Sequence, residues 1–166
     1  MKTELDRKEL EYFNHGFNEV KKFWKRFGGL PTLNATFLDV GCGHGALCID
    51  LAQQGAKKVI GVDIDAKRIT FAQNNLKLNY PELANKVEFY KIDLREFNNS
   101  EQFDYIISKD SFEHIIDLPL MIEEMKKRLK TNGYIYAGFG PLYRDFYGDH
   151  KRTNSIIPWG HLMRSD

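Results

Sequence analysis

Three glycines at every second position form the strongest chemical signal in this sequence. Gly41, Gly43 and Gly45 follow a short apolar run and precede a helical pattern. Glycine lets the chain turn sharply and lets backbone N–H groups approach a ligand with no side chain between them. Asp63 follows about 20 residues later, where a carboxylate can accept hydrogen bonds from both hydroxyls of a ribose. The two features together predict a site for an adenosine-type ligand.

Alternating strand and helix patterns position these residues. Large apolar residues at helical spacing indicate a first helix, and short β-rich runs separated by helical segments follow it. The predicted strands are 36–40, 59–62, 87–92, 103–107 and 133–139, and the predicted helices are 10–27, 46–54, 66–78 and 118–129, the last closed by Asn132-Gly133. Parallel strands need crossover connections, which are right-handed. We therefore expect an α/β, Rossmann-like, doubly wound and mostly parallel sheet with both faces covered.

Polar residues stand at the carboxyl ends of several predicted strands. Gly41, Asp63, Asp93 and the Ser108-Lys109 pair all occupy such ends. Ligands of open α/β sheets bind outside the carboxyl ends of the strands, near the point where strand order reverses. These residues are therefore expected to line one crevice.

Composition limits the possible classes of protein. A chain of 166 residues and 19.4 kDa suits one domain, and 42% hydrophobic residues exclude a wholly disordered chain. A formal net charge of +1 gives no global attraction to nucleic acid or to an anionic membrane. Cys42 and Cys48 are the only cysteines, so neither a disulfide framework nor a four-cysteine zinc site is expected. With no secretory leader pattern and no long apolar run, we expect a cytoplasmic protein with no metal.

Five segments, in this order and spacing, resemble the motif series of class I S-adenosylmethionine-dependent methyltransferases. They are 39–45, 62–65, 91–94, 103–107 and 112–117. The resemblance covers residues 36 to 140. It implies a sheet with strand order 3-2-1-4-5, from which the family's last two strands are missing here.

The resemblance also implies the cofactor, S-adenosylmethionine, with S-adenosylhomocysteine as the product. The backbone from Gly41 through Cys42 and Gly43 to Gly45 would face the methionine part. Asp39 would support its amino group, and the Ser108-Lys109 backbone would close this side of the site.

The adenosine side follows from the same resemblance. Asp63 would hold the ribose hydroxyls, and Ile64 would lie against the adenine ring. Asp93 and Leu94 would meet the amino edge of the adenine.

Several of these residues also have purely structural interpretations. Asp63 could cap the following helix, although Asp65 is the better candidate. Asp93 could simply begin a turn before Arg95. Cys42 fits a small side chain packed near a ligand, and Cys48 fits a helix core.

Two other ligand classes could use such a fold. Nicotinamide dinucleotide binding also uses a glycine turn followed by an acid, and Ala46 is a variant that its fingerprint tolerates. Asp93 together with 112–114 favours the methyltransferase interpretation. Nucleic-acid substrates are not expected, because no Asn/Asp-Pro-Pro-Tyr/Phe segment follows the fourth predicted strand.

The expected reaction is in-line attack of a small-molecule acceptor on the sulfonium methyl group. Such a reaction needs a base only when the acceptor must lose a proton. His114 is the catalytic candidate, although pinning the loop by hydrogen bonding is its other possible role. Tyr143, Tyr147 and His150 are candidates for the substrate side.

The predicted organisation has three parts: an amphipathic helix or lid at 1–30, a cofactor-binding core at 31–140, and an aromatic loop with a short C-terminal segment on the substrate side at 141–166. The fifth strand would expose an apolar edge, which natural proteins avoid. We therefore expect either a missing C-terminal portion or another chain covering that edge. A non-catalytic or truncated S-adenosylmethionine-binding module is the alternative function.

Overall fold

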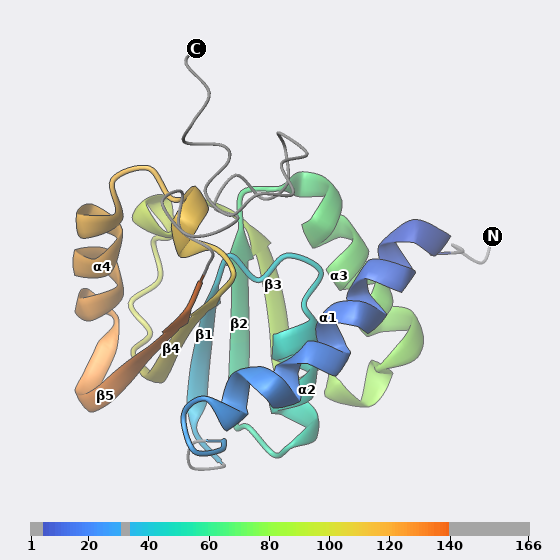
Figure 1. Ribbon diagram of the computed structural model, residues 1–166, viewed down its shortest axis with the longest axis horizontal. Coiled ribbons are helices and arrows are strands. Elements are labelled where there is room, and N and C mark those ends of the chain that lie inside the picture. Colours follow the sequence, from blue (N-terminus) through green and yellow to red (C-terminus); the bar gives the residue numbers. More distant parts are fainter. Residues whose placement is uncertain (1–4, 31–33, 140–166) are drawn as a thin grey trace, which may run out of the picture.

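In the part of the chain that the structure describes, five parallel strands form one sheet in the order β3-β2-β1-β4-β5. The computed structural model describes residues 5–30 and 34–139 (Figure 1). The strands are β1 (Thr36–Val40), β2 (Lys58–Asp63), β3 (Val87–Lys91), β4 (Phe103–Lys109) and β5 (Leu129–Gly138). The helices are α1 (Arg7–Lys25), α2 (Ala46–Gln53), α3 (Ala66–Asn79) and α4 (Leu118–Lys127), with short 3-10 helices η1 (Pro81–Leu83), η2 (Leu94–Glu96) and η3 (Phe112–His114). The predicted fold class and strand order are confirmed.

Helices cover both faces of the sheet, as the uninterrupted apolar strands require. Helices α1, α2 and α3 pack on one face, and α4 packs on the other (Figure 1). Every residue of β1 is buried, because this strand lies at the centre of the sheet. The strand order reverses between β1 and β4, so the ends of these two strands form the topological switch point where such sheets bind ligands.

Helix α1 is part of the main core. Asp6 caps its N-terminus by accepting hydrogen bonds from the backbone N–H groups of residues 8 and 9. Its buried side chains are Phe13, Val20, Phe23 and Trp24, which join the cluster formed with α2 and α3. The predicted apolar stripe extended to Phe27, but the helix ends at Lys25, and Phe27 is 39% exposed.

The junction of α4 and β5 corrects the prediction. The helix was expected to continue to residue 129 and to end at Asn132-Gly133, but it ends at Lys127, and Leu129 already pairs with Phe103. Asn132 has a positive φ of 67° inside β5, where the register shifts from the Phe103–Leu129 pair to the Tyr105–Tyr134 pair. An Asn-Gly pair permits this backbone conformation in a strand irregularity as readily as after a helix.

Strand β5 lies at one edge of the sheet and, within residues 5–30 and 34–139, pairs only with β4. Tyr134 on this strand is 60% exposed. The expectation that another segment or chain covers this edge stays a prediction. In the described part of the chain, no helix has the length and apolar character needed to cross a membrane.

Candidate functional site

The loop between β1 and α2 places three glycines at the switch point, where their backbone N–H groups donate to the Val62 carbonyl, the Asp63 carboxylate and the Cys42 carbonyl. Gly41, Gly43 and Gly45 have φ values of 78°, 53° and 80°. A Cβ on Gly41 would lie 2.2 Å from the hydroxyl oxygen of Ser111, and one on Gly45 would lie 2.5 Å from the Phe89 ring. A Cβ on Gly43 would meet nothing closer than 4.0 Å. Steric contact therefore requires glycine at two of the positions, whereas only the left-handed backbone favours it at the third.

Asp63 fastens the glycine turn to the end of β2. Its Oδ2 accepts a hydrogen bond from the backbone N–H of Gly43 at 2.8 Å, and its Oδ1 accepts one from Asp65 at 2.9 Å. Each carboxylate oxygen can accept a second hydrogen bond. Asp65 caps α3 by accepting from the N–H groups of Lys67 and Arg68, as predicted. Because Asp65 caps the helix, the remaining acceptor positions of Asp63 are available to a ligand at the end of β2.

A cavity of about 490 Å³ lies at the carboxyl ends of β1, β2 and β3, and we call it the strand-end cavity. Its lining includes Asp63, Ile64, Asp93, Leu94, His114 and Ile116. Two of its apolar side chains are unusually exposed, Ile64 at 71% and Ile116 at 84%. Exposed large apolar side chains in a concave site are typical of ligand contacts rather than of core packing.

Asp93 is engaged by a neighbour. Its carboxylate accepts hydrogen bonds from Arg95 Nε at 2.9 Å and Nη2 at 2.6 Å, and also from the Arg95 backbone N–H. The hydrogen bonds from Arg95 lower the pKa of Asp93. The turn before Arg95 that was considered for Asp93 is therefore present. Leu94 is buried in the core and also lines the cavity.

A second cavity of about 380 Å³ lies between α1 and the glycine turn, and we call it the α1-side cavity. It shares Gly41, Arg68, Asp110 and Ser111 with the strand-end cavity. The two cavities therefore adjoin at the glycine turn, as a ligand that extends across the switch point would require.

Asp39 lines the α1-side cavity from the end of β1 and is only 2% exposed. Its Oδ2 accepts a hydrogen bond from Cys48 Sγ at 3.4 Å, and it has no ion pair within the described residues. Burial raises the pKa of Asp39 to about 7. A cationic group in this cavity would supply the partner that the carboxylate lacks.

Ser108 and Lys109 play different parts at the end of β4. The Ser108 hydroxyl is buried and donates to the Val40 carbonyl at 2.9 Å, which ties β4 to β1. Lys109 lines the α1-side cavity and pairs with Asp110. The role predicted for their backbones, closing the methionine side of the site, stays a prediction.

Both cysteines are free and buried, in keeping with packing roles. Cys42 lines the α1-side cavity, and Cys48 lies in the α2 core. Burial raises the pKa of each thiol, which disfavours the nucleophilic thiolate. No cluster of three or more His, Cys, Asp or Glu side chains suited to a metal ion was found in the described residues.

His114 belongs to η3 and lines the strand-end cavity. Its catalytic role stays a prediction. Tyr143, Tyr147 and His150 lie outside the described residues.

A contact between α1 and the glycine turn was not predicted from the sequence. The buried His44 imidazole is hydrogen-bonded through Nε2 to Glu9, which also forms an ion pair with Lys67 of α3. The His44 ring lies 4.7 Å from Tyr12 and 5.2 Å from Phe71, between centroids. The hydrogen bond from His44 lowers the pKa of Glu9 to about 2. His44 was visible within the turn, but no sequence spacing links it to a helix that begins more than 30 residues earlier.

The sheet order, the glycine turn and the carboxylates at the strand ends define the fold of class I S-adenosylmethionine-dependent methyltransferases. A family model described as a methyltransferase domain matches residues 32–140, and the chain belongs to this family.

Individual relatives agree with this assignment. The chain is 36% identical over 113 residues to a ubiquinone biosynthesis O-methyltransferase of Bartonella tribocorum, which covers 65% of this chain and 42% of that one. It is 32% identical over 119 residues to the protein of the same name from Pelagibacter ubique, with 72% and 48% covered. The chain thus spans about half the length of these curated relatives. In fold, it resembles coclaurine N-methyltransferase bound to N-methylheliamine and S-adenosylhomocysteine, with a TM-score of 0.61 and 22% identity over 72% of this chain and 34% of that one.

Proposed function

We propose that this chain binds S-adenosylmethionine and takes part in methyl transfer to a small-molecule acceptor. The observation that carries the proposal is the pair of adjoining cavities at the switch point, with Asp63 in one and Asp39 in the other. Membership of the methyltransferase domain family and relatives named as O-methyltransferases support it.

The residues present fit this cofactor. Asp63 keeps acceptor positions for two hydroxyls, as a ribose requires. Ile64 and Ile116 offer exposed apolar surface for an adenine ring. Asp39 is a buried carboxylate with no ion pair among the described residues, which suits the α-ammonium group. Asp93, Leu94 and the backbones of the glycine turn and of Ser108-Lys109 keep the roles predicted for them.

When bound, the cofactor supplies a methyl group on a positively charged sulfur. The chain's own contribution is to orient and to exclude water, because charge on sulfur disappears during transfer and needs no new stabilising group. Holding two reactants in attack geometry lowers a barrier by about 7–11 kcal/mol at best. The rigid glycine turn, fixed to Asp63, provides that orientation.

The relatives' names support an oxygen atom as the methyl acceptor. A hydroxyl group must lose its proton around the time of attack, so this acceptor calls for a base. His114 is the proposed base, and Tyr143, Tyr147 and His150 are the proposed acceptor contacts. In the same scheme, residues 1–30 cover the site as a lid whose movement is confined to the start of α1, 31–140 hold the cofactor, and 141–166 lie on the acceptor side.

We also propose a cytoplasmic location. Two unpaired buried thiols, Cys42 and Cys48, support a reducing compartment.

Calorimetric titration with S-adenosylmethionine, S-adenosylhomocysteine and NAD tests the cofactor. We expect saturable binding of the first two, weakened at least about tenfold in Asp63→Asn because a charged hydrogen-bond acceptor is lost. Asp117→Asn is the matched control, since Asp117 caps α4 outside both cavities and should leave binding unchanged. Binding of NAD alone would refute the proposal.

Transfer of a labelled methyl group to a metabolite extract tests the reaction. Labelled product is expected. Tight cofactor binding without any labelled product would favour the non-catalytic binding module instead.

A further inference from the structure

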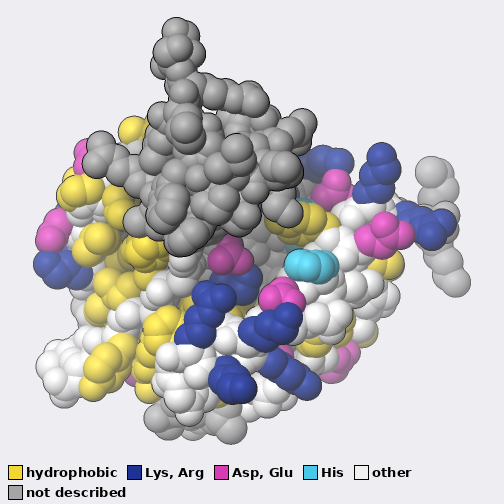
Figure 2. Space-filling model, in the orientation of Figure 1, with side chains coloured by type: hydrophobic (Ala, Val, Ile, Leu, Met, Phe, Trp, Pro, Cys, Tyr) yellow, Lys and Arg dark blue, Asp and Glu magenta, His cyan; other side chains and the backbone are white. Residues whose placement is uncertain are grey.

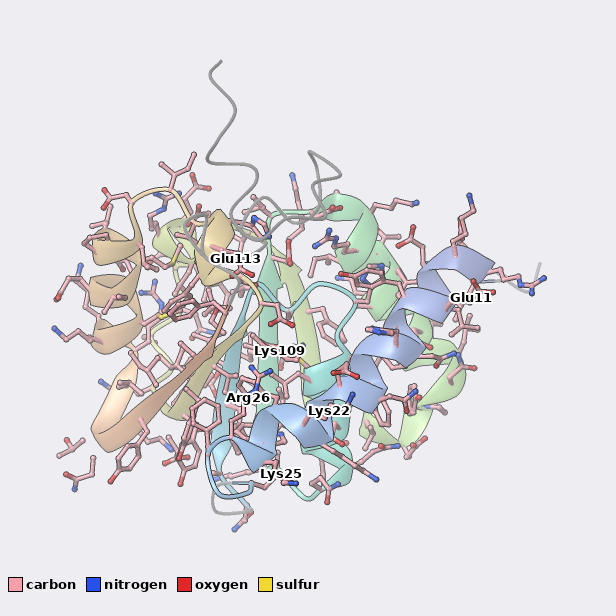
Figure 3. All side chains as sticks on the ribbon, viewed as in Figure 1. Glu11, Lys22, Lys25, Arg26, Lys109 and Glu113 are labelled. Atoms are coloured by element: carbon pink, nitrogen blue, oxygen red, sulfur yellow. The ribbon has the colours of Figure 1, made fainter. Side chains whose placement is uncertain are left out.

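Three basic side chains meet at the carboxyl end of β4, on the α1 side of the sheet. Lys22 and Arg26 lie one helical turn apart at the end of α1, and Lys109 is the last residue of β4. All three line the α1-side cavity. Figure 3 shows them grouped between α1 and the sheet, and Figure 2 shows basic side chains gathered on this face. We call Lys22, Arg26 and Lys109 the basic cluster.

Arg26 and Lys109 approach the same point from different elements. Lys109 pairs with Gly138 in the β4–β5 register. Arg26 Nη1 lies 4.0 Å from the position that a Cβ on Gly138 would take. The guanidinium therefore sits at the edge of the sheet beside the end of β4.

Two of the three cations in the basic cluster form ion pairs within the described residues, and the third does not. Lys22 pairs with Glu19 at 2.8 Å, and Lys109 pairs with Asp110. The Arg26 guanidinium has neither an ion pair nor a hydrogen bond with any residue in 5–30 and 34–139. Gathering like charges is unfavourable unless an anion joins them. A guanidinium presents a planar set of donors that matches a carboxylate or a phosphate.

The position of the basic cluster indicates which ligand supplies that anion. The features assigned to the ribose and adenine lie at the ends of β2 and β3, and Asp39 lies at the end of β1. The basic cluster lies beyond them, at β4 and β5, which is the side left for the second reactant. The same cavity is also lined by Tyr12, which is largely exposed and offers apolar surface elsewhere in the cavity.

We propose that the basic cluster binds an acidic group of the methyl acceptor, and that Arg26 is the main anion-binding residue. The acceptor is then a small molecule with a carboxylate or phosphate attached to an apolar body. This inference rests on the proposed function. The carboxylate of the cofactor's methionine part has the same chemistry, so the experiment must separate the two sources.

The test is ligand-observed NMR titration of the protein saturated with S-adenosylhomocysteine. The probes are benzoate, phenyl phosphate and, as the uncharged comparison, benzyl alcohol. We expect saturable binding of at least one acid in preference to the alcohol, weakened by added salt. Arg26→Gln should weaken that binding about tenfold or more and leave S-adenosylhomocysteine affinity unchanged.

Two further variants make the result specific. Lys25→Gln removes the same charge from the adjacent residue, which does not line this cavity, and should leave acid binding unchanged. Arg26→Lys keeps the charge but not the planar donor set, so an intermediate affinity is expected.

Three results would overturn the inference: acids that bind no better than benzyl alcohol, equal losses in Arg26→Gln and Lys25→Gln, or a loss of S-adenosylhomocysteine affinity in Arg26→Gln. The last result would assign Arg26 to the cofactor's own carboxylate. A protein that binds no S-adenosylhomocysteine at all would refute the proposed function. The same acid titrations, made without the cofactor product, would still decide whether Arg26 binds anions.

Discussion

Replacing Asp39 with asparagine should make the free protein more stable at neutral pH and make it bind the cofactor less well. The carboxylate is buried, and its pKa is raised from 3.8 to about 7. Asparagine has nearly the same shape and keeps an oxygen that can accept the hydrogen bond from Cys48. The substitution therefore removes the buried charge with little other change.

The size of the effect follows from the pKa. Below pH 3.8 Asp39 is protonated in both the folded and the unfolded chain. Between pH 3.8 and about 7 the unfolded chain ionises while the folded chain keeps its proton, so folding stability falls as pH rises. An interval of about 3 pH units, at about 1.4 kcal/mol each, gives roughly 4 kcal/mol as the upper limit of the destabilisation at pH 8. Asp39→Asn should recover much of that free energy of unfolding.

Urea denaturation at pH 5 and pH 8 measures this difference. Asp104→Asn is the control with the opposite sign. Burial opposes the shift at Asp104, but hydrogen bonds from Thr36 and Lys130 lower the pKa of Asp104 to about 2. Ionised Asp104 therefore stabilises the fold at pH 8, and its replacement should destabilise it.

Calorimetry with S-adenosylhomocysteine completes the experiment. Loss of a charged partner for an ammonium group should weaken binding about tenfold to a hundredfold in Asp39→Asn. In the wild type, affinity should fall as pH drops below 7, because Asp39 becomes protonated. A variant that is less stable than wild type at pH 8, or that binds equally well, would show that the reasoning about this carboxylate is wrong.

Three other predictions concern the turn, the helix and the cavity wall. Gly43→Ala should lower the free energy of unfolding by about 1–2 kcal/mol, from its left-handed backbone alone. Gly45→Ala should lower it by about 1–3 kcal/mol more, because the added methyl group meets the Phe89 ring. Equal losses for the two variants in urea denaturation would contradict the close contact between Gly45 and Phe89. Glu9→Gln should destabilise the protein at pH 7 and reduce the loss of stability between pH 4.5 and about 2, since the lowered pKa makes ionised Glu9 stabilising above that range. Thermal unfolding across this pH range measures the change in stability. Glu11→Gln, which removes an exposed ion pair, is the control. Ile64→Ser should weaken S-adenosylhomocysteine binding roughly threefold to tenfold while leaving thermal stability unchanged, because this side chain is exposed in the free protein. A loss of stability without a loss of affinity would show that Ile64 belongs to the core instead.

Local sequence patterns predicted most of the strands and helices, and the family resemblance predicted the order of the strands. The β-rich runs, the helical spacings and the glycine turn each reflect backbone or burial preferences within a few residues, so β1, α2, β2 and α3 lie within one residue of their expected bounds. The boundary between α4 and β5 was wrong because Asn132 permits a left-handed backbone in either a helix end or a strand irregularity. Pairing with β4 decides between them, and that pairing depends on tertiary structure.

The part of the site formed by residues at strand ends was predictable from the sequence. The part formed by side chains of α1 was not. Asp63 and Asp93 line one cavity because parallel strands end together. The contact between Glu9 and His44 and the position of Arg26 depend on how α1 packs across α2 and the sheet. The pattern of α1 showed which face is apolar, but it did not show which neighbours that face meets.

The packing of α1 also limits how molecules can enter and leave the protein. Swinging the whole helix away would expose four buried side chains, Phe13, Val20, Phe23 and Trp24, at about 1.5 kcal/mol or more each. A cost of about 6 kcal/mol leaves roughly one molecule in ten thousand open at any moment. Entry and release of ligands through the α1-side cavity therefore depend on its opening to solvent and on fraying of the helix before Phe13. In that part of the helix, Glu9 is bonded to His44. The time that the demethylated product stays bound should then depend more on the contacts of this first part of α1, among them those of Glu9 and Tyr12 with His44, than on the stability of the whole fold.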